Sequence, residues 1–182
     1  MNQSIANSLK SSLEPLKETG VISHLFGLAY TKDISENNSD IVSLPIPYDT
    51  QDDCADIYTL VPDETKRCIV YFDSEDESIS GLEVFSGQIR LVCWYNSKLY
   101  AYPSTVETFL IQSFLSKIST SNSNQELSFR VSDFSITNGE PIFRRYDYDK
   151  DYICPPFGRF VITIKLSISL RCVENSPNDS PC

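Results

Sequence analysis

The sequence predicts a single α+β domain in which two main helices pack on a mainly antiparallel or mixed β-sheet. The range 157–172 is apolar at nearly every second residue, a period typical of a strand with one buried face. The ranges 2–18 and 104–118 instead repeat apolar residues at three- and four-residue steps, as amphipathic helices do. Other strand-like runs occur without internal repeats or a clear linker, so residues 1–172 are expected to form one layered domain.

The first predicted helix, 2–18, carries one apolar stripe. Its members are Ile5, Leu9, Leu13 and Leu16. Pro15 is expected to kink this helix or to start a separate final turn, because proline removes a helical hydrogen bond and its ring clashes with the preceding turn. Gly20 is well placed to end the helix in the left-handed conformation.

A polar segment separates the next two predicted extended regions. The range 21–30 is apolar and strand-like, whereas 31–40 (TKDISENNSD) has the composition of an exposed loop. The range 41–48 is expected to be extended, because Pro45 and Pro47 block a helix and restrict the residues before them.

Two stronger strands follow. The range 67–72 (RCIVYF) is rich in β-branched and aromatic residues and is expected to be buried. An acidic turn is predicted at 73–78 (DSEDES), and the range 82–96 then forms the second strand, with Gly87 as a candidate bulge.

The second predicted helix follows Pro103. Ser104 and Glu107 match the S-x-x-E capping box, in which two side chains satisfy unpaired N–H groups at a helix start. The apolar residues after the box recur at helical spacing, and Phe109 and Phe114 among them are expected to pack on the sheet.

The remaining predicted elements are strands. The range 126–136 alternates, Asn138 and Gly139 form a turn signal, and 142–148 is a short strand candidate. The final strand, 157–172, is long enough to run past the sheet of one subunit and to take part in assembly. The tail, 173–182, is expected to be disordered.

Charge and composition exclude several classes of function. The chain has 182 residues and a formal net charge of −10, so its surface is expected to repel nucleic-acid phosphate rather than bind it. The first twelve residues lack the basic and apolar regions of a secretory signal. No apolar run approaches the roughly 20 residues of a membrane span.

The six cysteines are expected to be reduced thiols in a cytosolic compartment. They are Cys54, Cys68, Cys93, Cys154, Cys172 and Cys182. An even number leaves a disulfide framework as the alternative. Cys68 and Cys93 lie in strand-like apolar runs, where a free cysteine behaves as a small hydrophobic residue, and this favours the reduced state.

The sequence shows no catalytic signature. His24 is the only histidine, so a triad or a histidine-based zinc site is not expected, and the cysteines lack paired short spacings for zinc. The motifs of a nucleophile elbow, a P-loop and a dinucleotide-binding turn are absent from the sequence. We therefore expect neither an enzyme nor a bound cofactor or metal.

Two polar segments leave alternatives open. Asp147, Asp149 and Asp151 alternate as at the start of a calcium loop, but Tyr152 and Gly158 occupy the positions that need Gly and Glu. The other interpretation is a solvated loop anchored by its tyrosines. Stacking of these rings on nucleic-acid bases is not expected, because the neighbouring residues are acidic. The run 73–77 is an acid pair or cation site in one interpretation and a solvated turn in the other.

The order of elements resembles that of the tail-terminator and tail-completion proteins at the neck of tailed bacteriophages. The similarity comprises a first helix ending near Gly20, a central strand leading into a helix (GQIRLVCWYNSKLYAYPSTVETFLIQSFL) and a long closing strand (RFVITIKLSISLRC). The resemblance implies a structural virion protein without catalytic residues. It further implies a homo-oligomeric ring that joins or closes the tail, contacts other neck proteins and assembles in the host cytoplasm. An acidic ring would suit DNA passage, because it does not grip phosphate.

The polar face of the final strand is the predicted subunit interface. Lys165 and Arg171 lie on that face and are expected to meet carboxylates of a neighbouring subunit. The proposed carboxylates are Asp73, Glu75, Asp76 and Glu77. A monomeric cytosolic protein-binding module without enzymatic activity is the alternative, and the mass in solution distinguishes it from a ring.

Overall fold

The computed structural model describes residues 2–36, 40–47, 60, 64–74, 84–119, 127–137 and 155–170. Its elements are α1 (Asn2–Glu18), β1 (His24–Glu36), β2 (Asp40–Pro47), β3 (Cys68–Asp73), β4 (Val84–Asn96), α2 (Val106–Ile118), β5 (Leu127–Thr137) and β6 (Phe157–Leu170). The strands form one six-stranded sheet in the order β2-β1-β3-β4-β6-β5. Only the β1–β3 pair is parallel, which confirms the predicted mixed α+β fold.

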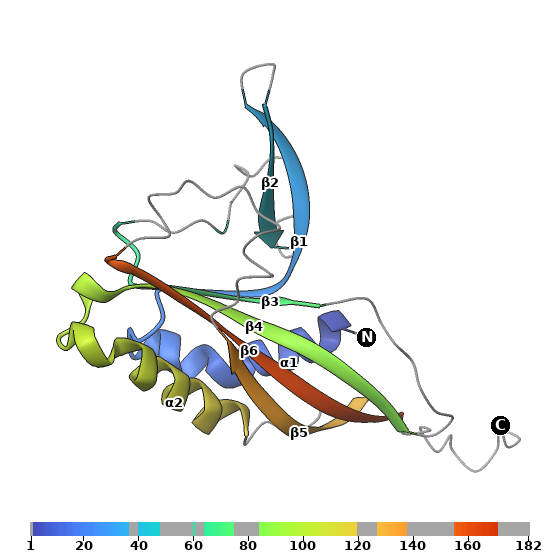
Figure 1. Ribbon diagram of the computed structural model, residues 1–182. Coiled ribbons are helices and arrows are strands. Elements are labelled where there is room, and N and C mark those ends of the chain that lie inside the picture. Colours follow the sequence, from blue (N-terminus) through green and yellow to red (C-terminus); the bar gives the residue numbers. More distant parts are fainter. Residues whose placement is uncertain are drawn as a thin grey trace, which may run out of the picture.

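Both helices cover the same face of the sheet (Figure 1). The stripe of α1 packs there, with Leu9 and Leu13 fully buried. Alternate residues of β3, β4 and β6 meet the helices, including Val70, Leu91 and Ile162. Among the described helices, none is long and apolar enough to cross a membrane.

The first helix confirms its predicted bounds and its predicted end. It runs through Pro15 as one element to Glu18, so no separate final turn forms. Gly20 has φ +75°, as expected. The Gly20 N–H bonds to the Lys17 carbonyl and the Val21 N–H to the Leu16 carbonyl, a pairing that satisfies the last turn of the helix.

In the polar segment 31–40, residues 31–36 and 40 lie in strands rather than in the predicted loop, and 37–39 lie outside the described residues. β1 continues to Glu36 and pairs with β2 over eight residue pairs, from Ala29↔Pro47 to Glu36↔Asp40. The backbone can form this ladder because strand pairing uses main-chain groups, which a polar sequence supplies as well as an apolar one.

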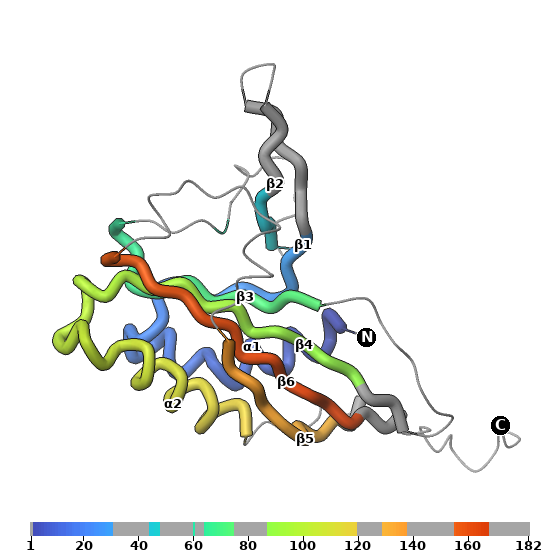
Figure 2. The backbone as a smooth tube through the Cα atoms, viewed as in Figure 1, coloured from blue at the N-terminus to red at the C-terminus, as the bar shows by residue number. Residues whose placement is uncertain are grey.

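The final strand lies inside the sheet. It pairs with β4 on one side and with β5 on the other along most of its length, so its backbone is not available as a free arm for assembly (Figure 2). Its apolar face is buried from Phe160 to Leu166 as predicted, and Val161 joins a second cluster on the opposite face that includes Tyr71 and Trp94. That second cluster explains why the alternation fails at Val161.

Two details of β4 and β5 differ from the expectation. Gly87 pairs directly with Leu166 in an unbroken register, so it is not a bulge. The register shift occurs instead in β5, between Val131 and Asp133. The Ser132 hydroxyl donates there to the Lys165 carbonyl at 3.1 Å.

The start of α2 corrects the predicted capping box. A 3-10 turn, Pro103–Thr105, contains Ser104, and the helix begins after Thr105 without a side-chain cap. Glu107 does not fold back onto the backbone; its carboxylate accepts a 2.9 Å hydrogen bond from the Tyr95 hydroxyl.

The core face of α2 is also displaced from the prediction. Phe114 is fully buried against Phe160, with 6.0 Å between ring centroids, as expected. Phe109 is 45% exposed, so its assignment to the core was wrong. The buried positions are Val106, Leu110, Phe114 and Ile118. These four follow a spacing of four residues, and Phe109 is rotated by about 100° from Leu110, toward solvent.

Candidate functional site

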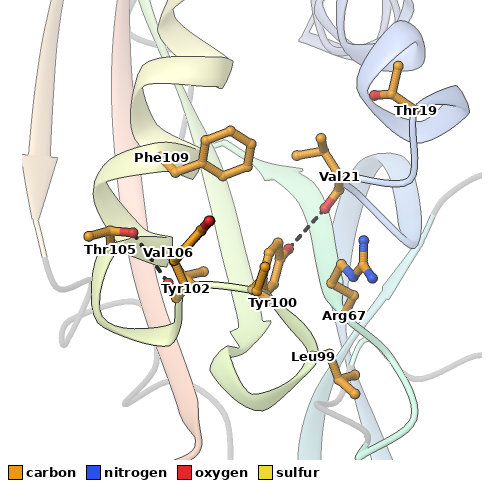
Figure 3. A pocket seen from close by; sticks show the side chains of 10 residues that line it. Thr19, Val21, Arg67, Leu99, Tyr100, Tyr102, Thr105, Val106 and Phe109 are labelled. Carbon is orange, nitrogen blue, oxygen red and sulfur yellow. Dashed lines mark hydrogen bonds between the residues drawn. The ribbon is translucent and has the colours of Figure 1, made fainter.

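A groove lies where the end of α1, the start of β3 and the connection from β4 to α2 meet (Figure 3). Its first hollow has a volume of about 350 Å³. It is lined by Thr19, Val21, Arg67, Leu99, Tyr100, Ala101, Tyr102, Thr105, Val106 and Phe109. A second hollow of about 410 Å³ adjoins it and shares Arg67 and Leu99 with it. We call the two together the Arg67 groove.

The backbone around the groove is fixed by hydrogen bonds between distant segments. The Asn96 N–H donates to the Arg67 carbonyl at 2.9 Å, and the Asn96 side chain accepts from the Lys98 N–H and donates to the Glu64 carbonyl. The Ser23 hydroxyl accepts from the Arg67 N–H at 2.9 Å. These bonds hold the end of β4 and the start of β3 together, so the groove walls are positioned by the sheet.

Tyr100 ties the turn after β4 to the end of α1. Its hydroxyl donates to the Val21 carbonyl at 2.9 Å, the bond drawn in Figure 3. Burial raises the pKa of Tyr100 well above its ordinary value, and the nearby thiols of Cys68 and Cys93 raise it further. The phenol is therefore neutral at physiological pH and remains a donor.

Arg67 supplies the charge of the groove. Its Nη1 donates to the Gly20 carbonyl at 2.8 Å, and its guanidinium carbon lies 5.2 Å from the centroid of the Tyr100 ring. The side chain is exposed and yet held by two contacts. Of the described residues that line the groove, Arg67 alone is charged, and its charge is opposite to the net charge of −10 of the whole chain.

Large apolar side chains stand around the groove. Leu99 is 37% exposed, Tyr102 76% and Phe109 45%. Among the residues whose side-chain exposure the structure describes, which leaves out 31–43, 84–86, 127–128 and 168–170, the remaining large exposed apolar residue is Ile136 on β5. A cluster of this kind beside a hollow is typical of an interaction surface, whereas single exposed apolar residues are ordinary.

Sequence reasoning missed this groove. It placed Phe109 in the core and treated Arg67 only as the start of a strand. A usable signal was present in the connection 97–102 (SKLYAY), where three large apolar residues lie between a strand and Pro103 rather than inside a periodic element. Their convergence on Arg67 depends on the fold and is not visible in the spacing.

The predicted interface residues have partners within the chain where the structure describes them. Asp73 is buried and accepts from the Arg90 guanidinium at 2.7 Å, so it is withdrawn from the exposed acidic surface predicted for it. Lys165 Nζ lies 3.0 Å from Asp133 Oδ2, and this hydrogen bond lowers the pKa of Asp133. Arg171, Glu75, Asp76 and Glu77 lie outside the described residues, as does the 147–152 loop.

Cys68 and Cys93 are buried as predicted. Both are free thiols, and their Sγ atoms lie 3.5 Å apart on adjacent strands. Burial is the main cause that raises the pKa of Cys93 well above its ordinary value, so it stays a thiol rather than a reactive thiolate. The other four cysteines lie outside the described residues. His24 is placed in β1, with its ring stacked on Phe26 at 6.2 Å between centroids.

Comparison with models of known protein families, with curated proteins and with solved structures finds no match for this chain.

Proposed function

We propose that the protein is a structural subunit of the phage head–tail neck that assembles with copies of itself into a ring, without catalytic activity. The observation that carries the proposal is the β1–β2 hairpin, whose ladder continues beyond the last pair between β1 and β3. The resemblance of the element order to neck proteins supplies the biological setting, and the geometry of the hairpin supplies a physical reason for assembly.

The hairpin is a two-stranded extension of a larger sheet. β1 pairs with β3 only from His24 to Leu28, and beyond that point its ladder is with β2. Eight residue pairs correspond to roughly 26 Å of ribbon. A two-stranded ribbon is marginally stable in water by itself, so a projection of this length is best explained by a surface of another subunit that supports it.

The outer edge of the hairpin disfavours continuous strand addition. The Pro45 carbonyl accepts from the Leu60 N–H, so the backbone of Pro45 faces away from β1. Pro47, two residues later, faces the same way. Both prolines are buried and neither has an N–H to donate, so this stretch of the β2 edge does not pair with a strand of another subunit.

Net charge is compatible with this function. A ring through which DNA passes must not hold phosphate, and holding phosphate requires clusters of Lys and Arg. The chain has 25 acidic and 15 basic residues, a balance that repels DNA.

The test compares the full chain with a hairpin-trimmed variant. The variant is cut at the Thr31↔Pro45 pair and closed by an Asn-Gly turn, which fits a two-residue hairpin. Light scattering and electron microscopy of the full chain should show a closed oligomer, alone or with a tail-tube preparation. The variant should keep its circular dichroism and melting curve but remain at the mass of one chain. A full chain that stays monomeric in both conditions, or a trimmed variant that still forms rings, refutes the proposal.

A monomeric protein-binding module is the second candidate. The Arg67 groove favours it, because an apolar recess with exposed aromatic residues suits the recognition of a partner. A mass of one chain for both proteins in the test above would favour this candidate.

A further inference from the structure

We propose that the Arg67 groove binds an extended peptide segment of a partner protein, in which a large apolar side chain is followed at once by a carboxylate. This inference does not depend on ring formation, since the groove is built from the end of α1, the start of β3 and the β4–α2 connection. It assigns a ligand class to a recess beside which Leu99, Tyr102 and Phe109 are exposed.

The apolar part of the ligand is specified by the first hollow. Its walls carry Tyr102 and Phe109 on one side and Val21 on the other, with Tyr100 between them (Figure 3). Tyr100 is held in place by its bond to Val21, so the hollow is largely formed before a ligand arrives. A Phe, Leu or Met side chain would remove water from Tyr102 and Phe109, which are the most exposed of these residues.

The anionic part is specified by Arg67. A guanidinium has five N–H donors, and one of them is used by the Gly20 carbonyl. None of the described carboxylates forms an ion pair with Arg67 at the groove. A carboxylate of the ligand would therefore gain a charge-assisted hydrogen bond, next to apolar surface that lowers the local dielectric. In a chain of net charge −10, Arg67 gives this recess a positive charge that complements an acidic segment.

The shape favours a peptide over a small molecule. Small-molecule sites usually enclose most of the ligand surface, whereas Tyr102, at the rim here, is 76% exposed. Arg67 and Leu99 line both hollows, and the second hollow is lined further by Ser23 and Thr65, so the charged side chain is accessible from both. An extended chain can place its apolar side chain in the first hollow, its carboxylate at Arg67 and its backbone along the second.

The experiment uses the full chain and four fluorescein-labelled six-residue probes, Gly-Ser-X-Z-Gly-Ser, with X-Z being Phe-Asp, Phe-Asn, Ala-Asp and Phe-Lys. Fluorescence anisotropy gives the affinities, and NMR of the labelled protein locates the site. Phe-Asp should bind about tenfold more tightly than Phe-Asn, the scale of one hydrogen bond to a charged group. Ala-Asp and Phe-Lys should bind more weakly still, and affinity for Phe-Asp should fall with added salt.

Matched variants locate the site. Arg67→Gln should reduce Phe-Asp binding to the level of Phe-Asn, whereas Arg130→Gln, an exposed arginine on β5, should change nothing. Phe109→Ser should weaken both Phe probes, whereas Ile136→Ser, at 46% exposure against 45% for Phe109, should not. Melting curves of all four variants check that the fold is kept, and Arg67→Lys provides a charge-retaining variant if Arg67→Gln lowers stability.

Three results would overturn the proposal. One is the absence of shifts around the groove with the Phe-Asp probe at about 1 mM, the weak end of specific binding. Another is equal binding of Phe-Asp and Phe-Asn, or binding that Arg67→Gln leaves unchanged. The third is binding of phenylacetate as tight as that of the peptide, because the site would then recognise a small aromatic acid. None of these results bears on ring formation, which is measured by mass.

Discussion

Gly158 provides a sharp test of the packing at the end of the sheet. It pairs directly with Tyr95 across β4 and β6, and the Tyr95 ring lies over it. A Cβ built at this position overlaps the ring of Tyr95, at a separation that real atoms do not adopt. The Tyr95 ring cannot shift without loss, because its hydroxyl donates to Glu107 and its face contacts Phe160 at 6.2 Å between centroids.

The expected cost of Gly158→Ala follows from these contacts. Overpacking typically costs about 1–3 kcal/mol, and displacement of the ring also breaks a hydrogen bond to a carboxylate. We expect a total loss of about 2–4 kcal/mol, which lowers the melting temperature by about 2–4 °C per kcal/mol in a chain of this size. Urea denaturation of the variant measures the free energy of unfolding directly.

A double-mutant cycle identifies the cause. In a Tyr95→Ala background the ring is gone, so Gly158→Ala should cost almost nothing further, and the coupling should nearly equal the single-site cost. Tyr95→Phe separates the hydroxyl from the ring, because it removes the bond to Glu107 but keeps the clash. If Gly158→Ala is as damaging without the ring as with it, the loss comes from the backbone of β6 and the steric reasoning is refuted.

Three further predictions concern the core. Phe114→Ala should cost about 3–5 kcal/mol, whereas the exposed Phe109→Ala should cost under about 1 kcal/mol; equal losses in urea denaturation would place Phe109 in the core after all. Burial raises the pKa of Tyr100 in the folded protein above its value in the unfolded chain. The neutral phenol therefore stabilises the fold below about pH 10. This stabilisation is lost as the pH rises above that value, because Tyr100 ionises first in the unfolded chain. Tyr100→Phe should flatten the fall of the urea midpoint between about pH 9 and 11, and an unchanged slope would contradict this. Cys68 and Cys93 should react with iodoacetamide only as fast as the protein unfolds, measured by peptide mass; modification of the native protein within minutes would show that the site opens locally.

The fold was predictable from the sequence because its core elements carry strong periods. The stripe of α1, the apolar run of β3 and the alternation of β6 each specify a type of structure by themselves. The sequence did not show which residues of the central strands are buried on the second face of the sheet. Val161 breaks the alternation of β6 because it joins Tyr71 and Trp94 on the far face, a consequence of sheet order rather than of local sequence.

The errors have physical causes that differ from one another. The segment 31–40 was assigned to a loop because its composition is polar, and composition reports exposure while the ladder of the hairpin uses backbone groups. Ser104 and Glu107 match a capping box, but Glu107 instead accepts from Tyr95, a partner twelve residues away that only the folded sheet brings near. Phe109 has helical spacing, and the choice between two adjacent faces of a helix depends on what packs against it.

The hairpin and the Arg67 groove lie at opposite ends of β1. The strand begins at His24, just after the groove residues Val21 and Ser23, and ends at Glu36 in the hairpin. Thirteen residues of strand separate the two surfaces by roughly 40 Å along the chain. One subunit can therefore use both surfaces at once, and a cyclic assembly through the hairpin would leave every groove with the same orientation on the ring. In such a ring, weak affinity of one groove for a peptide would be multiplied by the number of copies, so that a partner carrying several acidic segments would bind the ring far better than a single subunit.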